Sequence, residues 1–295
     1  MNEVTRSTTV ILLFFALPLA GAETLGSARK DARCTEYDPP GAEELRNAEK
    51  LFAAAFSPAT EISALTRLAR GIDLEILPIV REDDEIIVLR EAPHALRGRG
   101  FFAFRRKDAR PLALQAPHSW EDLHTGLIAE MLFLESHAAA SAWNTAPRST
   151  AVKGENRLAD LAHLPDSLLH AFTRAFASAY PRGTLLQIHG FDAGKRATRE
   201  GSGSAVILSD GTKSPPIWVL DAAECLEVAL SERVSVYPRH VKELGATTNT
   251  QGKVFQEIGH AGFLHVEMDL ELRRRLKETE KLRNAFLQCM PDIRK

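Results

Sequence analysis

Hydrophobic positions along the chain change from helical spacing to short strand-like runs, and then alternate between the two. Apolar residues at helical intervals cover 43–56 and 62–70, and from residue 73 to 116 short apolar runs are broken by Pro, Gly and charge. Beyond residue 120, helix-like segments alternate with the strand-like runs TLLQI, AVILS, PIWVL, VSVYP and FLHVEMD, and 270–290 reads as one long helix. This alternation predicts an α/β fold with a mixed, mostly parallel central sheet flanked by helices.

The first 22 residues have the pattern of a secretory signal peptide. Arg6 precedes the apolar run VILLFFALPLA, and the small residues Ala20, Gly21 and Ala22 follow it. The run is shorter than the roughly 20 apolar residues that cross a bilayer. We therefore expect a signal peptide at 1–22, no stable membrane anchor after its removal, and a secreted or periplasmic protein.

The remaining chain divides by composition. We expect a flexible N-terminal segment at 23–40, which is polar, and an accessory helical and β segment at 41–110. A main α/β domain should then cover 111–295. The alternative for 41–110 is that it forms part of the main sheet.

Overall charge narrows the class of partner. The 295 residues are 44% hydrophobic and 26% charged, with a formal net charge of -2, so no nucleic-acid partner is expected.

The cysteines Cys34, Cys225 and Cys289 are too few for a disulfide scaffold and lack C-x-x-C spacing. One pair could close in an oxidising compartment, but the sequence does not determine which one.

Polar side chains that could bind a metal follow three strand-like runs. His118 and Glu121 come after RPLALQA, His189 follows TLLQI, and Glu267 lies on FLHVEMD. Working residues of α/β sheets gather where the strands end. Catalytic zinc sites need nitrogen and carboxylate ligands and a further carboxylate to move a proton, which predicts His118, Glu121 and His189 as zinc ligands and Glu267 as the base. Each residue taken alone also fits a structural role, such as a charge at a helix N-terminus.

The order of these motifs resembles the zinc carboxypeptidase superfamily and, within it, the N-formylglutamate amidohydrolase branch. The matching stretches are PHSWE at Pro117–Glu121, LLQIHGF at Leu185–Phe191 and LHVEMDLELR at Leu264–Arg273. The resemblance implies a zinc-dependent hydrolase of an amide bond, often one next to a free carboxylate, with Glu267 as general base. It also implies an arginine that binds the substrate, for which Arg148 after SAWNT is the candidate, with three rivals in neighbouring loops: Arg157, Arg196 and Arg199.

Several assignments stay open at this point. Asp122 or His124 could replace Glu121 as the ligand, and Asp160 with His163 forms another polar pair near the site. The expected partner is a small-molecule or peptide substrate. The rival hypothesis is an exported, non-catalytic binding or interaction protein on the same fold.

Overall fold

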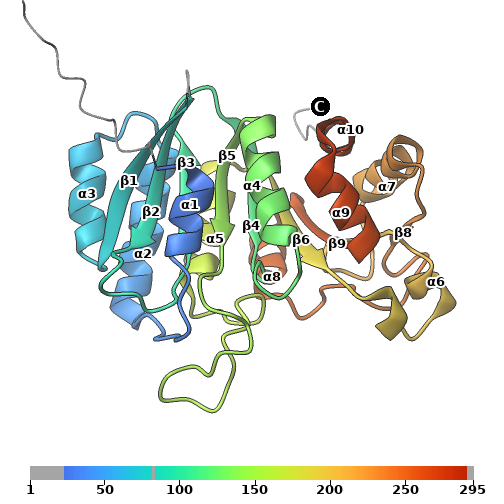
Figure 1. Ribbon diagram of the computed structural model, residues 1–295, viewed down its shortest axis with the longest axis horizontal. Helices are drawn as coiled ribbons and strands as arrows, with labels where there is room; N and C mark the ends of the chain where they lie inside the picture. Colours follow the sequence, from blue (N-terminus) through green and yellow to red (C-terminus); the bar gives the residue numbers. More distant parts are fainter. Residues whose placement is uncertain (1–22, 82–83, 291–295) are drawn as a thin grey trace, which may run out of the picture.

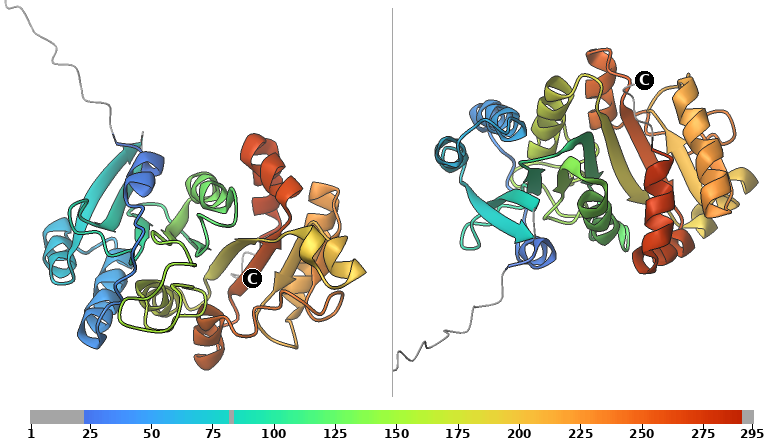
Figure 2. Two further views of the ribbon diagram at one scale, coloured as in Figure 1. Left: turned by 60° about the horizontal axis from the view of Figure 1, so that its bottom comes forward. Right: turned by 90° about the horizontal axis from the view of Figure 1, so that it is seen from above.

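The computed structural model describes residues 23–81 and 84–290, and the predicted signal peptide at 1–22 lies outside them. One mixed sheet of nine strands runs through this part of the chain, with helices on both of its faces (Figures 1 and 2). The strands follow the order β1 (Leu74–Arg81), β2 (Asp84–Glu91), β3 (Phe101–Arg105), β5 (Ala138–Trp143), β4 (Arg110–Ala116), β6 (Thr184–Gly190), β9 (Phe263–Met268), β7 (Val206–Ser209) and β8 (Val234–Val236). The expected α/β class with a mixed sheet between helices is confirmed.

Parallel pairing is concentrated in the middle of the sheet. Strands β5, β4, β6 and β9 are parallel neighbours, and β7 pairs with β8 in the same way. The first three strands, the β3–β5 pair and the β9–β7 pair are antiparallel. The parallel central strands therefore bring their carboxyl ends to one edge, where loops can converge.

Alternation along each strand separates two hydrophobic cores, one on each face. On β4, Leu112 and Leu114 enter one core while Ala113 enters the other, and on β6 Leu186 and Leu185 divide in the same way. The first core is covered by α1 (Leu25–Asp31), α4 (Thr125–Ser136), α7 (Ile217–Leu230), α9 (Leu270–Glu278) and α10 (Glu280–Gln288). The second is covered by α2 (Ala42–Phe56), α3 (Ile62–Arg70), α5 (Leu168–Ala179) and α8 (Thr250–Glu257).

The segment 41–110 is continuous with the rest of the molecule. Its last strand, β3, pairs with β5, which places Phe101 opposite Trp143 and Phe104 opposite Ala140. Phe104 also packs on Phe172 of α5, with ring centroids 5.7 Å apart. The boundary expected at residue 110 therefore falls inside a single sheet and its shared core.

The segment 23–40 is not the flexible chain that its polarity predicted. Helix α1 (Leu25–Asp31) lies within this segment, and its Ala28 is fully buried. Arg29 forms an ion pair of 3.2 Å with Glu130 of α4, and both side chains are nearly covered. The prediction was wrong because a short helix with few apolar residues can be held by a distant ion pair, which composition does not reveal.

Two further segments differ from the sequence pattern. The run PIWVL predicts a strand, but helix α7 begins at Ile217, directly after Pro216, and places Val219 and Leu226 in the core. The predicted C-terminal helix is two helices, since the chain turns at Thr279. Arg283 stabilises this break by donating to the carbonyl of Leu276 at 2.7 Å.

The structure also resolves the cysteine pairing. A disulfide joins Cys225 of α7 to Cys289 at the end of α10, and Cys34 is buried and free.

Within the described ranges, no helix has the length and apolar character needed to cross a membrane. The short elements η1 (Ala193–Lys195) and α6 (Arg199–Ser202) lie in the connection between β6 and β7.

Candidate metal centre

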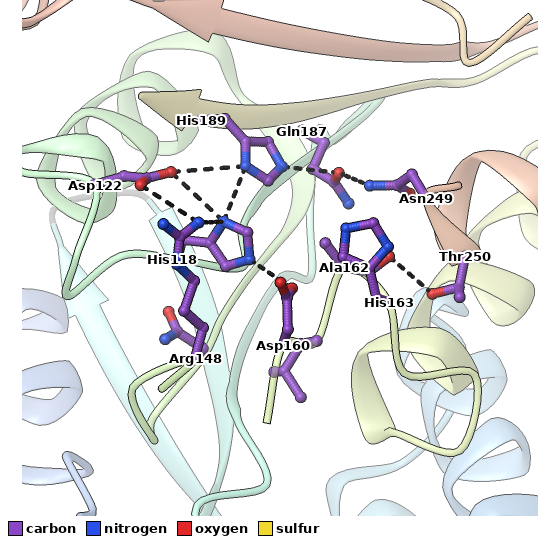
Figure 3. Close-up of polar contacts among 12 residues, drawn as sticks. His118, Asp122, Arg148, Asp160, Ala162, His163, Gln187, His189, Asn249 and Thr250 are labelled. Atoms are coloured by element: carbon purple, nitrogen blue, oxygen red, sulfur yellow. Dashed lines mark hydrogen bonds and ion pairs between the residues drawn. The ribbon is translucent and has the colours of Figure 1, made fainter. Parts of the chain in front are cut away.

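The candidate site lies at the carboxyl edge of the parallel strands. His189 is the sixth residue of β6, and Glu267 is its register partner on β9. His118 follows β4, which pairs with β6 on the other side. Figure 3 shows His118, Asp122 and His189 pointing toward one another. The sheet therefore brings together side chains from three neighbouring strands, as the strand-end pattern predicted.

The loop after β4 decides which acidic residue enters the site. The backbone N–H of Asp122 donates to the carbonyl of His118 at 2.9 Å, which makes one helix-like turn. Residues four apart share a face of such a turn, so Asp122 lies beside His118. Its Oδ2 is held by the N–H of Gly190 at 3.0 Å. Glu121 lines the same cavity but is exposed, and the group of converging ligand atoms contains Asp122 in its place.

Three ligand atoms form a compact triangle. Nδ1 of His118 lies 3.2 Å from Nδ1 of His189, and Oδ2 of Asp122 lies 3.6 Å from each of these nitrogens. The outer nitrogen of each ring is engaged elsewhere: Nε2 of His118 lies 2.8 Å from Asp160, and Nε2 of His189 lies 2.9 Å from Oε1 of Gln187. Because carboxylate and amide oxygens accept hydrogen bonds, both outer nitrogens carry N–H groups and both Nδ1 atoms face the triangle.

The triangle has the dimensions of one face of a tetrahedral zinc site. Zinc bonds to nitrogen and oxygen of about 2.0–2.2 Å place neighbouring ligands of a tetrahedron about 3.3–3.6 Å apart. Two of the observed separations, 3.6 and 3.6 Å, match that spacing, and the third, 3.2 Å, is slightly shorter. Asp160 and Gln187 hold the rings as outer partners of metal-binding histidines commonly do. His118, Asp122 and His189 therefore fit a zinc ion.

Electrostatics at the triangle favour positive charge. Burial by itself lowers the pKa of His118, but the carboxylates of Asp122 and Asp160 outweigh it and raise this pKa to about 9. For Asp122, burial raises the pKa, and the two histidines, whose Nδ1 atoms lie 3.6 Å from Oδ2, reverse this and hold the pKa well below its usual range. A negative field that retains a proton on an imidazole also attracts a metal cation, which competes for the same nitrogen.

His189 differs from His118 because burial dominates. Burial lowers the pKa of His189 to about 4, with the charge of His118 adding to this effect and Asp122 opposing it. The residue is 4% exposed. His189 is therefore neutral at physiological pH, which is the protonation state in which histidine binds metals.

Glu267 is buried at the wall of the same cavity. Burial, followed by the negative charge of Asp122, raises the pKa of Glu267 to about 8. Among the described residues, none donates to its Oε2, and the nearest basic nitrogen, Nε2 of His265, lies 3.7 Å from Oε1. A carboxylate with a free oxygen and a raised pKa is suited to receive a proton.

Arg148 reaches the site from the loop after β5. Its Nη1 lies 3.2 Å from Nδ1 of His118 and 4.0 Å from Oδ1 of Asp122, while 45% of its side chain remains exposed. The rival Arg157 is bound to Glu155 and Asp166 within the same loop. The structure thus places Arg148, of the candidate arginines, beside the converging ligands.

A cavity of about 850 Å³ opens over the triangle. The described wall includes His163, whose ring contacts the carbonyl of Thr248, and Arg196, which lies 3.5 Å from Glu243. Besides the triangle, a second group of ligand atoms converges nearby, from His189, His265 and Glu267. His124 is the residue before α4 and belongs to neither group. The space is large enough for a small organic molecule or the end of a peptide.

Sequence reasoning missed two residues of the site. His265 lies two positions before Glu267 on β9, and its ring packs against His189 with centroids 4.5 Å apart. Strand alternation placed His265 on the face of Glu267, but nothing in the sequence gave it a role. Gln187, which precedes His189 by two, had no sequence signal because a glutamine inside an apolar run matches no metal motif.

Comparisons with known proteins gave no matching family model and no matching curated protein. Among solved structures, similarity extends to the zinc-free apo form of YndL, with 12% identity, 61% of this chain and 82% of that chain covered, and a TM-score of 0.38. A bacteriophage poly-gamma-glutamate hydrolase has 8% identity, 63% and 84% coverage and a TM-score of 0.40. The gene product Atu2144 from Agrobacterium tumefaciens has 12% identity, 61% and 88% coverage and a TM-score of 0.38. At these scores the likeness is one of partial fold, and the chemistry of the site rests on this chain's own atoms.

Proposed function

We propose that this protein is an exported zinc-dependent hydrolase that cleaves an amide bond in an acylated amino acid or a peptide. The observation that carries the proposal is the triangle of Nδ1 of His118, Nδ1 of His189 and Oδ2 of Asp122, with sides of 3.2 and 3.6 Å. A zinc ion held there would supply Lewis-acid chemistry, acidifying water and polarising a carbonyl. Two histidines and one carboxylate are the ligand class of several catalytic zinc sites.

Glu267 would move the proton that hydrolysis requires. Opening an amide needs a water molecule to lose a proton as it adds to the carbonyl carbon, and the departing nitrogen to gain one as the C–N bond breaks. Glu267 lies opposite His189 in the sheet and has an oxygen without a hydrogen-bond donor in the described part of the chain. The same carboxyl group can therefore receive the first proton and deliver the second.

Arg148 would bind the substrate. Its guanidinium lies at the edge of the ligand triangle and is half exposed, so it can contact a molecule that enters the cavity. The planar guanidinium matches a carboxylate or a polarised carbonyl oxygen. This supports a substrate with an acidic group near the scissile bond, and peptides, cell-wall fragments and acylated amino acids all meet that requirement.

Export has separate support. The disulfide between Cys225 and Cys289 is of the kind that persists in oxidising compartments. The sequence at 1–22 has the charge, apolar run and small residues of a signal peptide.

Metal removal and restoration test the proposal. The mature protein would be assayed on a panel of N-acyl amino acids and short peptides, before and after treatment with a chelator, and again after zinc is added. We expect hydrolysis that the chelator abolishes and zinc restores, and none from the His118→Ala/His189→Ala double variant. Activity that survives in the double variant would sink the proposal. Zinc binding without hydrolysis of any substrate would favour the non-catalytic binding protein.

A further inference from the structure

A chain of buried amides lies directly beneath the candidate metal centre. Gln187 is fully buried on β6, and its Oε1 lies 2.9 Å from Nε2 of His189 (Figure 3). We propose that Gln187 is a positioning residue that keeps the proton of His189 on Nε2, so that the lone pair of Nδ1 faces the metal. The inference rests on the proposed metal site, because it assigns a role toward a ligand of that site.

His189 has competing acceptors on both sides of its ring for its single proton. On the Nδ1 side, Nδ1 of His118 lies 3.2 Å away, and Oδ2 of Asp122, which already accepts from the N–H of Gly190, lies 3.6 Å away. On the Nε2 side, Gln187 lies at 2.9 Å, which is a normal hydrogen-bond length. A proton on Nδ1 would block the nitrogen that the metal needs, so the outcome of this competition decides whether the site is ready to bind.

The amide of Gln187 is fixed from one side by the cap of α8. Oδ1 of Asn249 accepts from the backbone N–H groups of Gln251 and Gly252, each at 3.0 Å. The Nδ2 group of Asn249 is therefore the part that faces Gln187, and it donates to Oε1. A helix N-terminus, whose N–H groups can only donate, thus determines which atom of Gln187 points toward Asn249 and His189.

Gln251 fixes the other half of the amide. Its Nε2 donates to the backbone carbonyl of Leu161 at 3.0 Å, so its Oε1 is left to face Gln187. Nε2 of Gln187 donates to that oxygen at 3.2 Å. Because a backbone carbonyl can only accept, the orientation of Gln251 follows, and that of Gln187 follows from it.

Gln115 on β4 provides a second acceptor for Gln187. The two residues are register partners in the sheet, and Nε2 of Gln187 donates to Oε1 of Gln115 at 2.9 Å. Nε2 of Gln115 in turn donates to the hydroxyl oxygen of Thr173, whose own proton goes to the carbonyl of Leu169. The direction of the hydrogen bonds from Gln187 through Gln115 to Thr173 is therefore also set by a backbone group, the carbonyl of Leu169.

All branches of this network give Gln187 the same orientation. If its amide were reversed, its NH₂ group would face the NH₂ group of Asn249, and its oxygen would face the oxygens of Gln115 and Gln251. Buried donors facing donors are strongly unfavourable where water cannot intervene. Gln187 consequently presents an oxygen to His189, and only an N–H at Nε2 satisfies it.

The test measures the tautomer of His189 in the metal-free protein. Long-range ¹⁵N NMR of the histidine rings at neutral pH distinguishes a protonated from an unprotonated ring nitrogen, and needs no zinc and no substrate. We expect the parent protein to carry the proton of His189 on Nε2. In Gln187→Met the acceptor is lost, and the proton should shift toward Nδ1 and Asp122. Zinc affinity should then fall about 10- to 100-fold, as for other residues that orient metal ligands.

Two further variants separate positioning from general damage. Gln115→Met removes an amide of the same type and the same complete burial, but leaves the contact between Gln187 and His189, as well as the Gln187–Gln251 bond, in place. It should keep the Nε2–H tautomer and a zinc affinity near that of the parent. Gln187→Glu keeps an acceptor oxygen toward His189 and, when its carboxyl group is protonated, a donor toward Gln115 or Gln251, so it should show the parent tautomer.

The possible results divide clearly. A parent protein whose His189 carries its proton on Nδ1 would overturn the inference, and this measurement depends on no variant. Equal losses of zinc affinity in Gln187→Met and Gln115→Met would overturn it as well, since they would show a role in packing alone. A parent protein that shows the Nε2–H tautomer but binds no zinc would contradict the proposed function and leave the tautomer assignment supported.

Discussion

Glu267 and His189 occupy paired positions on the adjacent parallel strands β9 and β6. This register places a carboxyl group with a raised pKa next to an imidazole whose Nδ1 faces the ligand triangle. Neither side chain lies on a mobile loop, so their separation is set by backbone hydrogen bonds. A site built on paired strands holds its geometry better than one built on loops.

Replacing Glu267 by Gln should separate catalysis from metal binding. The amide has nearly the same shape but cannot take a proton from water, so turnover should fall by about 10²- to 10⁴-fold. Zinc content should be unchanged if the ion sits in the triangle of His118, Asp122 and His189, because Glu267 belongs to the second group, with His189 and His265, and not to the triangle. Measuring turnover and bound zinc on the same preparation checks both expectations, the loss of turnover and the unchanged zinc content. Full activity in Glu267→Gln would show that another group moves the proton.

Arg148→Met should lower kcat/KM and leave the zinc content unchanged. Hydrogen bonds to charged groups contribute about 1.5–3 kcal/mol, so kcat/KM should fall roughly 10- to 100-fold. Arg157→Met is the matched control, because Arg157 lies in the same loop but binds Glu155 and Asp166. Equal effects of the two variants would point to a disturbance of the loop and not to substrate binding by Arg148.

Reduction of the disulfide should lower stability and spare the site. The bond between Cys225 and Cys289 links positions 64 residues apart, and closing a loop of this kind typically stabilises a protein by about 2–4 kcal/mol. Denaturant unfolding with and without reductant measures the loss, and a Cys225→Ser/Cys289→Ser variant should show no response to reductant. Identical unfolding of the parent protein in both conditions would mean that the disulfide does not form in solution.

His170 on α5 should make stability depend on pH. Burial, with the nearby charge of Arg174 adding to it, lowers the pKa of His170 in the folded protein. The unfolded chain therefore binds more protons, and the free energy of unfolding should fall as the pH drops through about 6.5 toward the folded pKa. Urea unfolding at about pH 7.5 and about pH 5.5 should show a smaller loss in His170→Leu than in the parent protein. An equal loss in both proteins would assign the pH dependence to other groups.

Much of the fold could be predicted from periodicity, because strands and helices with one buried face leave a regular pattern. Leu112, Ala113 and Leu114 alternate between the two cores, as the run RPLALQA predicted. The spatial order of the strands could not be predicted in this way, since periodicity says nothing about which strands are neighbours. For the same reason, the sequence offered the inclusion of 41–110 in the main sheet, which the pairing of β3 with β5 shows, only as an alternative.

The site could be predicted in part. Strand ends and alternation led to His118, His189 and Glu267, which the structure brings together. The choice between Glu121 and Asp122 depends on the turn after His118, whose carbonyl accepts from the N–H of Asp122, and on the N–H of Gly190, which holds the Asp122 carboxylate; a loop sequence reveals neither contact. Buried amides such as Gln187 are recognisable only once their partners on other strands are known.

The zinc content of two neighbouring variants tests the proposed site most directly. Metal would be measured by plasma mass spectrometry on the mature protein, purified without chelator, beside Asp122→Asn and Glu121→Gln. The geometry predicts about one zinc ion per chain in the parent and in Glu121→Gln, and a large loss in Asp122→Asn, because only Asp122 completes the ligand triangle. Zinc retained in Asp122→Asn and lost in Glu121→Gln would contradict this assignment, and a parent protein that takes up no zinc even when it is supplied would contradict the metal centre itself.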